Sequence, residues 1–299
     1  MNNKSSKPIT LCFLILAVFP AWGQQASFDV TSSVDWARGE LYSQVSFDLA
    51  QAGIRLPAGR FFAEETLEDA YPELLRPSLL SLRLDSNTTV GNLAERGELP
   101  LALLDSICLE AEKVPPSLSP DLKRMTGRYT MLMDRISALF TRHRQAIEPP
   151  MPLIRAPSAN YSGIIIIADN ELPVHGRRGQ AVVEPCIFPK IWDTDMNLIY
   201  ERNMLNPENE TGNRMVRYTT RESIFQPSPS GLEGELAALV GSNPLRILAR
   251  EVFGLNPTDP VIDREDALKI LSSENNRRLL REGRVVLVLN ETKLKSSLN

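Results

Sequence analysis

The stretch that decides the fold of the second half of this 299-residue chain is YSGIIIIAD, residues 161–169. Its four consecutive isoleucines are β-branched and lie between turn-forming residues. A short continuous apolar run of this kind is typical of a strand that is buried on both faces of a sheet. We therefore expect residues 164–167 to form such a strand.

The last fifty residues give a β–turn–α–β pattern. Residues 245–252 predict a strand and residues 256–260 a turn. A helix is expected to begin after Asp263 and to end at Gly283, and residues 285–289 predict a second buried strand. This unit has the size of a small interaction module.

The first half combines alternating and helical patterns. Residues 27–36 and 42–49 alternate apolar and polar side chains around a turn at 38–40, which predicts a hairpin. Residues 61–80 and 90–112 have helical spacing. Together with the second half, these patterns predict an α+β fold of two small modules of mixed sheet with packed helices.

A proline-rich stretch separates the two halves. Residues 148–152 read EPPMP, and Pro157 follows closely. Such a composition favours a stiff linker rather than a helix or strand. We therefore predict an N-terminal module over 24–148, a linker over 149–160 and a C-terminal module over 161–299.

The first 23 residues have the pattern of a secretory signal peptide. Lys4 and Lys7 precede an apolar run over 9–19, and Ala21-Trp22-Gly23 offers small residues for cleavage. The run is too short to cross a bilayer, which takes about 20 apolar residues. The sequence thus predicts export to the periplasm, and no spanning segment in the mature chain.

The charge argues against a nucleic-acid partner. The formal net charge is −4. Loss of the signal segment would also remove Lys4 and Lys7 and make the net charge more negative. Nucleic-acid binding needs concentrated positive charge. Basic residues gather only near the end of the predicted C-terminal helix, where we expect a solvated face; they are Arg277, Arg278, Arg281 and Arg284.

Three cysteines are present, and Cys12 lies within the signal segment. Lipidation of Cys12 is disfavoured, because bulky Leu11 precedes it and the apolar run continues beyond it. Cys108 and Cys186 would share an oxidising compartment, so a disulfide between them is one interpretation. Two separately buried thiols are the other.

One segment has part of the pattern of a calcium loop. Residues 193–197, DTDMN, place oxygen side chains at alternate positions. However, Leu198 stands where such a loop needs glycine, and Met204 where it needs glutamate. We favour a β-turn in which Asp193 and Asn197 bond their own backbone.

The sequence also lacks the common catalytic and zinc-binding motifs. His143 and His175 lie far apart, without a zinc-binding motif, and no serine-nucleophile motif occurs in the mature chain. GRRG, residues 176–179, could hold an anion, although a surface loop is the preferred interpretation. We assign no catalytic, cofactor-binding or metal-binding residue, and expect neither a cofactor nor enzymatic activity.

The second half resembles exported bacterial envelope proteins of the FlgP-type lipoprotein class. The resemblance covers residues 161–290 and is carried by Tyr161-Ser162-Gly163, by FPKIWD at 188–193, by Asn243-Pro244-Leu245 and by the final unit at 263–289. In the first half, DWARG at 35–39 is similar in placement. The resemblance implies association with the flagellar base or, peripherally, with the outer membrane. It carries over no functional residue.

The sequence favours two functional interpretations over a third, a novel hydrolase. The first is a non-enzymatic periplasmic protein that assembles with itself or with envelope proteins, through exposed strand edges or helix faces. The alternative is a periplasmic protein that binds a small molecule or a polysaccharide in a cleft between the modules.

Overall fold

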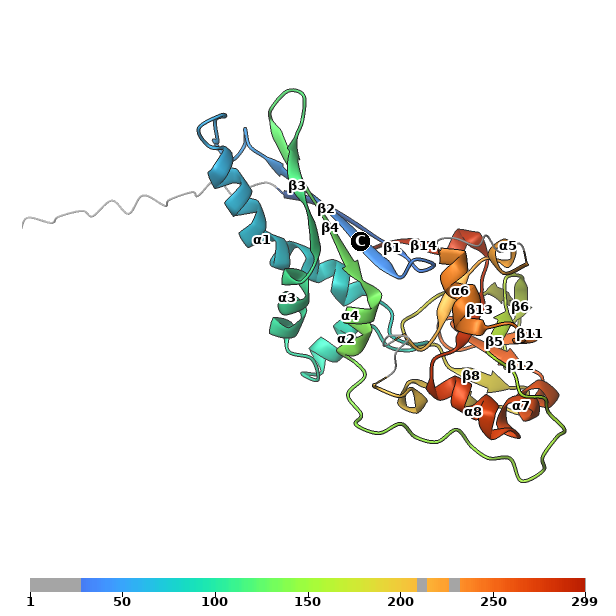
Figure 1. The fold of residues 1–299 in the computed structure, drawn as a ribbon. Coiled ribbons are helices and arrows are strands. Elements are labelled where there is room, and N and C mark those ends of the chain that lie inside the picture. Colours follow the sequence, from blue (N-terminus) through green and yellow to red (C-terminus); the bar gives the residue numbers. More distant parts are fainter. Residues whose placement is uncertain (1–27, 209–213, 226–231, 299) are drawn as a thin grey trace, which may run out of the picture.

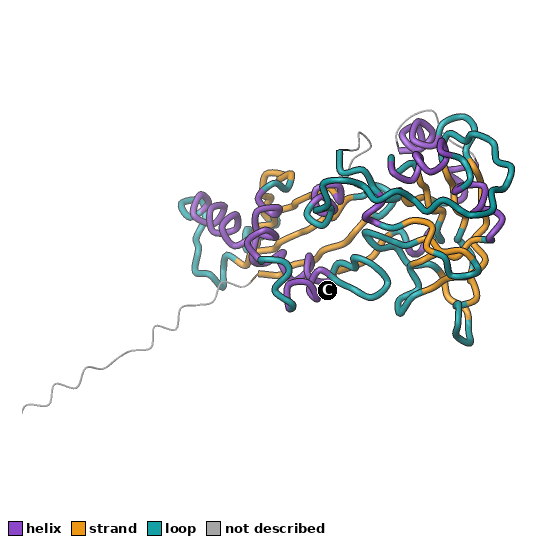
Figure 2. Tube along the Cα trace, turned by 90° about the horizontal axis from the view of Figure 1, so that it is seen from below, coloured by secondary structure: helices purple, strands orange, loops and turns teal. Residues whose placement is uncertain are grey.

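The computed structural model describes residues 28–208, 214–225 and 232–298. These residues form two main β-sheets with helices packed on them, so the fold is α+β, as the sequence predicts. The molecule is elongated, with one sheet towards each end (Figures 1 and 2). Within the described ranges, no helix is long and apolar enough to span a membrane.

Five antiparallel strands form the first sheet, in the order β14-β1-β2-β4-β3. The strands are β1 (Phe28–Asp35), β2 (Glu40–Asp48), β3 (Glu112–Leu118), β4 (Arg124–Leu132) and β14 (Lys295–Leu298). The predicted hairpin is confirmed, since β1 and β2 pair along their whole length.

Helices cover one face of this sheet. They are α1 (Arg60–Ser81), α2 (Val90–Glu95), α3 (Leu101–Leu109) and α4 (Met133–Ala138). Alternate residues of β2, including Leu41, Val45 and Phe47, are buried on this face, where α1 packs on the sheet. The residues between them are more exposed, which is the usual pattern of an antiparallel sheet that has one buried face and one solvent-exposed face.

Seven strands form the second sheet, in the order β10-β13-β5-β11-β12-β8-β9. The strands are β5 (Ile164–Ile167), β8 (Ile191–Asp193), β9 (Leu198–Tyr200), β10 (Arg217–Thr219), β11 (Leu245–Phe253), β12 (Asp259–Ile262) and β13 (Val285–Val288). The first four in this order run parallel. A separate hairpin joins β6 (Glu171–Pro173) to β7 (Gln180–Val182).

The isoleucine strand is buried on both faces, as predicted. Ile165 and Ile167 pack with Leu236 and Val240 of α6 (Leu232–Val240). Ile164 and Ile166 belong to the main core, together with apolar residues of α7 (Arg264–Leu271) and α8 (Glu274–Arg281). The single C-terminal helix expected from the sequence is therefore two helices, separated at Ser272 and Ser273.

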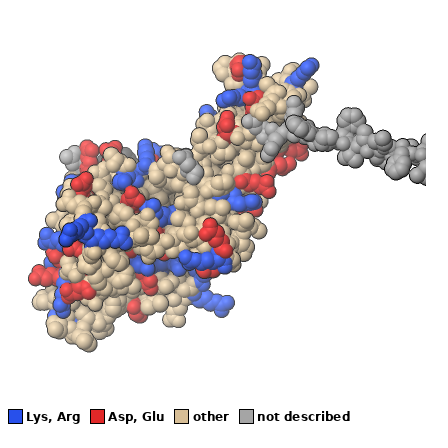
Figure 3. All heavy atoms as spheres, turned by 180° about the vertical axis from the view of Figure 1, so that it is seen from behind, with Lys and Arg blue, Asp and Glu red and all other residues tan. Residues whose placement is uncertain are grey.

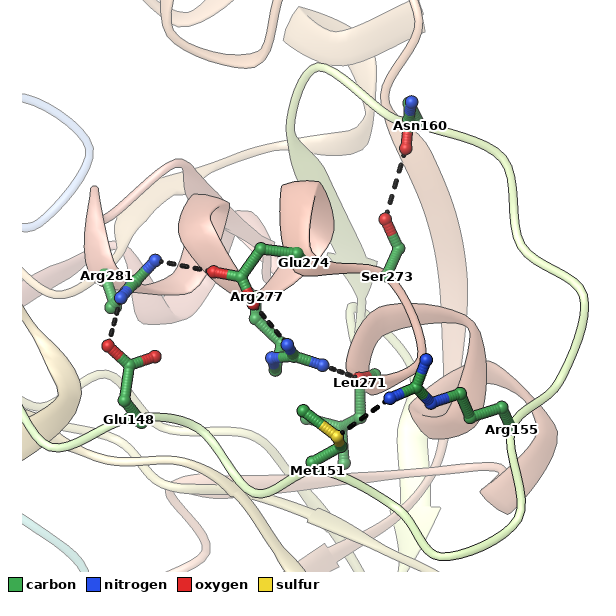
Figure 4. Close-up of polar contacts among 9 residues, drawn as sticks. All are labelled: Glu148, Met151, Arg155, Asn160, Leu271, Ser273, Glu274, Arg277 and Arg281. Atoms are coloured by element: carbon green, nitrogen blue, oxygen red, sulfur yellow. Dashed lines mark hydrogen bonds and ion pairs between the residues drawn. The ribbon is translucent and has the colours of Figure 1, made fainter.

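The proline-rich segment contains no helix or strand and lies along α7 and α8 (Figure 4). The Ala156 N–H donates to Ser272 Oγ at 3.0 Å, and Ser158 Oγ donates to the Lys269 carbonyl at 2.6 Å. The Tyr161 N–H donates to Asn276 Oδ1 at 3.1 Å. The segment is therefore anchored to the second module instead of hanging free.

The last strand does not follow the module boundary expected from the sequence. We assigned residues 161–299 to the C-terminal module, but β14 pairs antiparallel with β1, from Asp35↔Lys295 to Ser32↔Leu298. The chain thus returns from the second module to complete the first sheet. Residues from both ends of the described chain build that sheet.

A hairpin-like loop of the first module, residues 82–89, docks on the second. We call it the junction finger. Three of its carbonyls, those of Arg83, Leu84 and Ser86, accept hydrogen bonds from the second module. The donors are the backbone N–H groups of Ile187, Phe188 and Asn256, at 3.0, 2.7 and 3.0 Å respectively.

Replacement of Gly254 by alanine tests the finger contact. The new Cβ would lie 2.4 Å from Ser86 Cβ, and the φ of +116° is unfavourable for alanine. We expect Gly254→Ala to lower the free energy of unfolding by about 2–4 kcal/mol. Gly97→Ala is the control, because Gly97 has φ +73° but nothing within 4 Å of the added Cβ; it should cost only about 1–2 kcal/mol. Equal losses in urea unfolding would contradict close packing of the finger.

Candidate functional site

A cavity of about 470 Å³ lies at the junction of the two modules. We call it the junction pocket. Its walls come from the end of α1 and the junction finger, from residues 184–185, from η2 (Glu291–Lys293) and from β14. Because both modules supply walls, the pocket exists only when the finger and β14 are in place.

A carboxylate between two cations forms part of the wall. Glu184 Oε2 lies 2.5 Å from Arg83 Nη1, and Glu184 Oε1 lies 3.1 Å from Lys293 Nζ. Burial raises the pKa of Glu184, but the hydrogen bonds from Arg83 and Lys293 outweigh burial, so the pKa lies below its ordinary value. The triad therefore carries a net positive charge at neutral pH and ties the finger to the second module.

The rest of the lining is rich in hydroxyl groups. Trp36 Nε1 donates to Ser296 Oγ at 3.0 Å, and the indole packs edge-on against Tyr218 with ring centroids 5.8 Å apart. Lys295 is mostly exposed, with Nζ 3.9 Å from Asp35 Oδ2. Hydroxyls and cations around a concave site suit a polar, oxygen-rich ligand.

A buried polar cluster lies where the finger meets β12. Asp259 is buried, and its carboxylate accepts hydrogen bonds from Thr258 Oγ1 (2.8 Å), Lys190 N (3.2 Å) and Trp192 Nε1 (3.4 Å). Burial raises the pKa of Asp259 despite these donors. The sequence did not indicate this cluster, because the composition of residues 256–260 predicts a turn, whereas Asp259 is the first residue of β12.

The two remaining cysteines are free and buried. Cys108 Sγ lies 4.0 Å from the Pro72 carbonyl, between α3 and α1. Cys186 lies beside Tyr218, whose hydroxyl donates to the Cys186 carbonyl at 2.7 Å. Burial raises the pKa of both thiols. The structure thus has the second of the two arrangements considered, two separate thiols rather than a disulfide.

The histidines are not brought together. His143 Nε2 lies 2.6 Å from the Leu205 carbonyl, whereas His175 Nδ1 lies 2.5 Å from Glu251 Oε2. In the part of the chain that the structure describes, no three His, Cys, Asp or Glu side chains are grouped so that they could hold a metal ion.

The segment at 193–197 is a β-turn, as preferred from the sequence. Asp193 Oδ1 accepts from the N–H groups of Asp195 and Asn197, at 3.0 and 2.8 Å. The residues at 176–179 form the exposed turn between β6 and β7.

The expectation of a solvated arginine face is wrong for Arg277, which is only 6% exposed. Arg277 Nη1 donates to the carbonyl of Leu271, the last residue of α7, at 2.7 Å (Figure 4). A helix end leaves such carbonyls without partners inside the helix, and the guanidinium supplies one. Arg281 pairs with Glu148 and Glu274, joining α8 to the segment that precedes the linker.

Comparison with protein families gives two matches. Residues 27–139 match the N-terminal domain of Treponema pallidum Tp0624, and residues 163–291 match the second domain of the same protein. The chain is similar to Tp0624. The two matched ranges follow the order of the Tp0624 domains and flank the linker, and neither domain name refers to an activity or a ligand. No curated protein matches the chain. These matches do not bear on the FlgP-type resemblance, which stays a prediction.

Glu184→Gln tests the triad through pH. A carboxylate whose pKa is lower in the folded than in the unfolded state stabilises the fold above its unfolded pKa, and this stabilisation disappears as the pH falls through the folded value. We expect the substitution to cost about 1 kcal/mol at pH 7, since the group is partly exposed to screening solvent. The difference from the unsubstituted protein should begin to shrink as the pH falls below the ordinary glutamate pKa of about 4.3, and should be smaller at pH 3 than at pH 7.

Urea unfolding at pH 7 and pH 3 checks this expectation. Glu171→Gln is the control, because Glu171 is an exposed residue of β6. A pH-independent difference, or an equal effect of the control, would contradict the role given to the triad.

Proposed function

We propose that the protein is a non-enzymatic component of the bacterial envelope, exported to the periplasm, that works by assembling with itself or with envelope proteins. The signal-peptide pattern at the N-terminus supports export. The observation that carries the proposal of assembly is an exposed aromatic pair at the start of α1.

This pair is Phe61, 75% exposed, and Phe62, 60% exposed. Half-buried Ile54 and Leu56 of the preceding loop are apolar and close in sequence; we call the four residues the aromatic tip. Burial of apolar area yields about 25 cal/mol per Å². Aromatic residues are enriched at the centres of protein interfaces. A partner surface would thus gain free energy by covering the tip.

The free edges of the first sheet favour a side-chain contact over strand addition. The edge strand β3 contains Pro115 and Pro116, which have no N–H to donate. The other edge strand, β14, carries the exposed Lys295. Proline and lysine on edge strands hinder pairing with further strands. Assembly through the aromatic tip is therefore more consistent with the fold than sheet extension.

The mass of the protein in solution tests assembly. We expect light scattering behind a sizing column to show a discrete oligomer for the protein without its signal segment, and a shift to monomer for Phe61→Ser/Phe62→Ser. Leu153→Ser/Ile154→Ser is the matched control, because these adjacent linker residues are also exposed. A monomer at every concentration would refute self-assembly, and pull-down with envelope extract would then test the heterologous form.

The junction pocket favours a second function, binding of a small polar ligand or a saccharide. Its volume and hydroxyl-rich lining carry this alternative. A saccharide that binds there should raise the unfolding temperature of the native protein. Trp36 lines the pocket, so binding should also change its fluorescence. If cell-wall saccharides at millimolar concentration change neither quantity, this alternative fails. Flagellar association, implied by the sequence resemblance, remains a prediction.

A further inference from the structure

A second hollow, of about 300 Å³, is lined in part by residues of the junction finger that do not line the junction pocket, namely Leu84, Asp85 and Thr88. Three arginines from separate elements line it: Arg96 at the end of α2, Arg142 after α4, and Arg202 in η1 (Arg202–Met204). We call it the arginine hollow. Leu84 and Phe140, both buried, contribute apolar surface.

Neutral groups hold two of the arginines in position. Arg142 Nε donates to the Leu139 carbonyl at 2.9 Å, and Arg142 Nη1 donates to the Glu98 carbonyl at 3.3 Å. The guanidinium carbon of Arg202 lies 5.2 Å from the centre of the Phe188 ring. These contacts fix the side chains without neutralising their charge.

No carboxylate in residues 28–208, 214–225 and 234–298 forms an ion pair within 4.0 Å of these three guanidinium groups. Two acidic residues do line the hollow, Asp85 and Glu98. Asp85 Oδ1 is engaged by its own turn, accepting from the N–H groups of Asn87 and Thr88 at 2.9 Å each. Glu98 is exposed. The hollow therefore keeps an excess of positive charge.

Other polar groups lie beside the arginines in the lining of the hollow. The Leu205 carbonyl can only accept, so His143 Nε2, 2.6 Å away, carries the hydrogen and donates. Asn203 and Thr88 complete the polar part of the lining. On the surface shown in Figure 3, by contrast, acidic and basic side chains are mixed. Ion pairs such as Arg250–Asp263, at 2.6 Å, are typical of the rest of the molecule.

We propose that the arginine hollow binds a small acidic ligand, with its carboxylate or phosphate group against Arg142 and Arg202 and its organic body against Leu84, Leu93 and Phe140. Guanidinium forks match the geometry of both oxyanions and form charge-assisted hydrogen bonds. Arginines that are already positioned lose less conformational freedom on binding. The volume suits a ligand at the small end of the usual range. This site is separate from the junction pocket, and it does not depend on assembly.

Calorimetric titration tests the proposal with three probes of similar body: phenyl phosphate, benzoate and neutral phenol. We expect at least one of the two acids to bind at least tenfold more tightly than phenol. The stronger acid identifies the oxyanion, because the two probes differ chiefly in that group. Arg142→Gln and Arg202→Gln should each weaken its binding about tenfold, the loss expected for one charge-assisted hydrogen bond.

The matched control is Arg177→Gln/Arg178→Gln, which removes two exposed arginines from the β6–β7 turn and should leave the affinity unchanged. Arg142→Lys retains the positive charge but not the forked guanidinium group. This conservative change is less disruptive to the fold than glutamine, and it should still weaken binding. Thermal unfolding without ligand confirms that each variant is folded. Failure of both acids to bind the unsubstituted protein, or an equal loss in the control, would overturn the proposal.

Discussion

The docking of the junction finger on the second module is the constraint on which the rest of the structure depends. The carbonyls of Arg83, Leu84 and Ser86 find their hydrogen-bond donors across the junction. Buried backbone groups without partners are costly, so these bonds admit one register of the finger against residues 187–188 and 256. Gly254 leaves room for Ser86 at the same place.

The finger also organises the candidate sites. Arg83 lines the junction pocket, and Leu84 lines the arginine hollow. The side chains of one short loop therefore serve both cavities. Strand β14 supplies a further wall of the pocket after the chain has crossed back to the first sheet. Both cavities are consequently features of the assembled pair of modules, and neither module would form them alone.

The main core extends through both modules. It includes Val34 and Leu75 of the first module as well as Ile164 and Leu287 of the second. Two modules that share a core, and that are also linked by β14 crossing to the first sheet, are poorly suited to wide hinge opening. This favours a rigid binding or assembly component over a protein that closes around its ligand.

Local patterns predicted much of the fold. Apolar and polar residues alternate in β1 and β2, and β5 is a run of isoleucines. Each pattern indicates a strand from only a few neighbouring residues. The proline-rich linker also lacks regular structure, as its composition indicates. These features were accessible because period and turn chemistry are properties of the sequence itself.

Features that depend on distant residues were not predicted. Residues 295–298, KSSL, have no strong strand pattern, and their pairing with β1 is visible only in three dimensions. Arg277 is buried because the end of α7 lies beside it, which no spacing of arginines reveals. The arginines at 96, 142 and 202 lie far apart in the sequence, and only the packing of α2, the segment after α4 and η1 brings them to one hollow.

Hydrogen exchange of the unliganded protein tests most directly whether the finger locks the two modules together. If it does, the amides of Ile187, Phe188 and Asn256 exchange only through openings nearly as costly as those of the core strand β5. Their protection factors should then approach those of Ile165 and Ile166. Rapid exchange at these three amides, with β5 still protected, would show that the modules separate readily and would contradict a rigid junction.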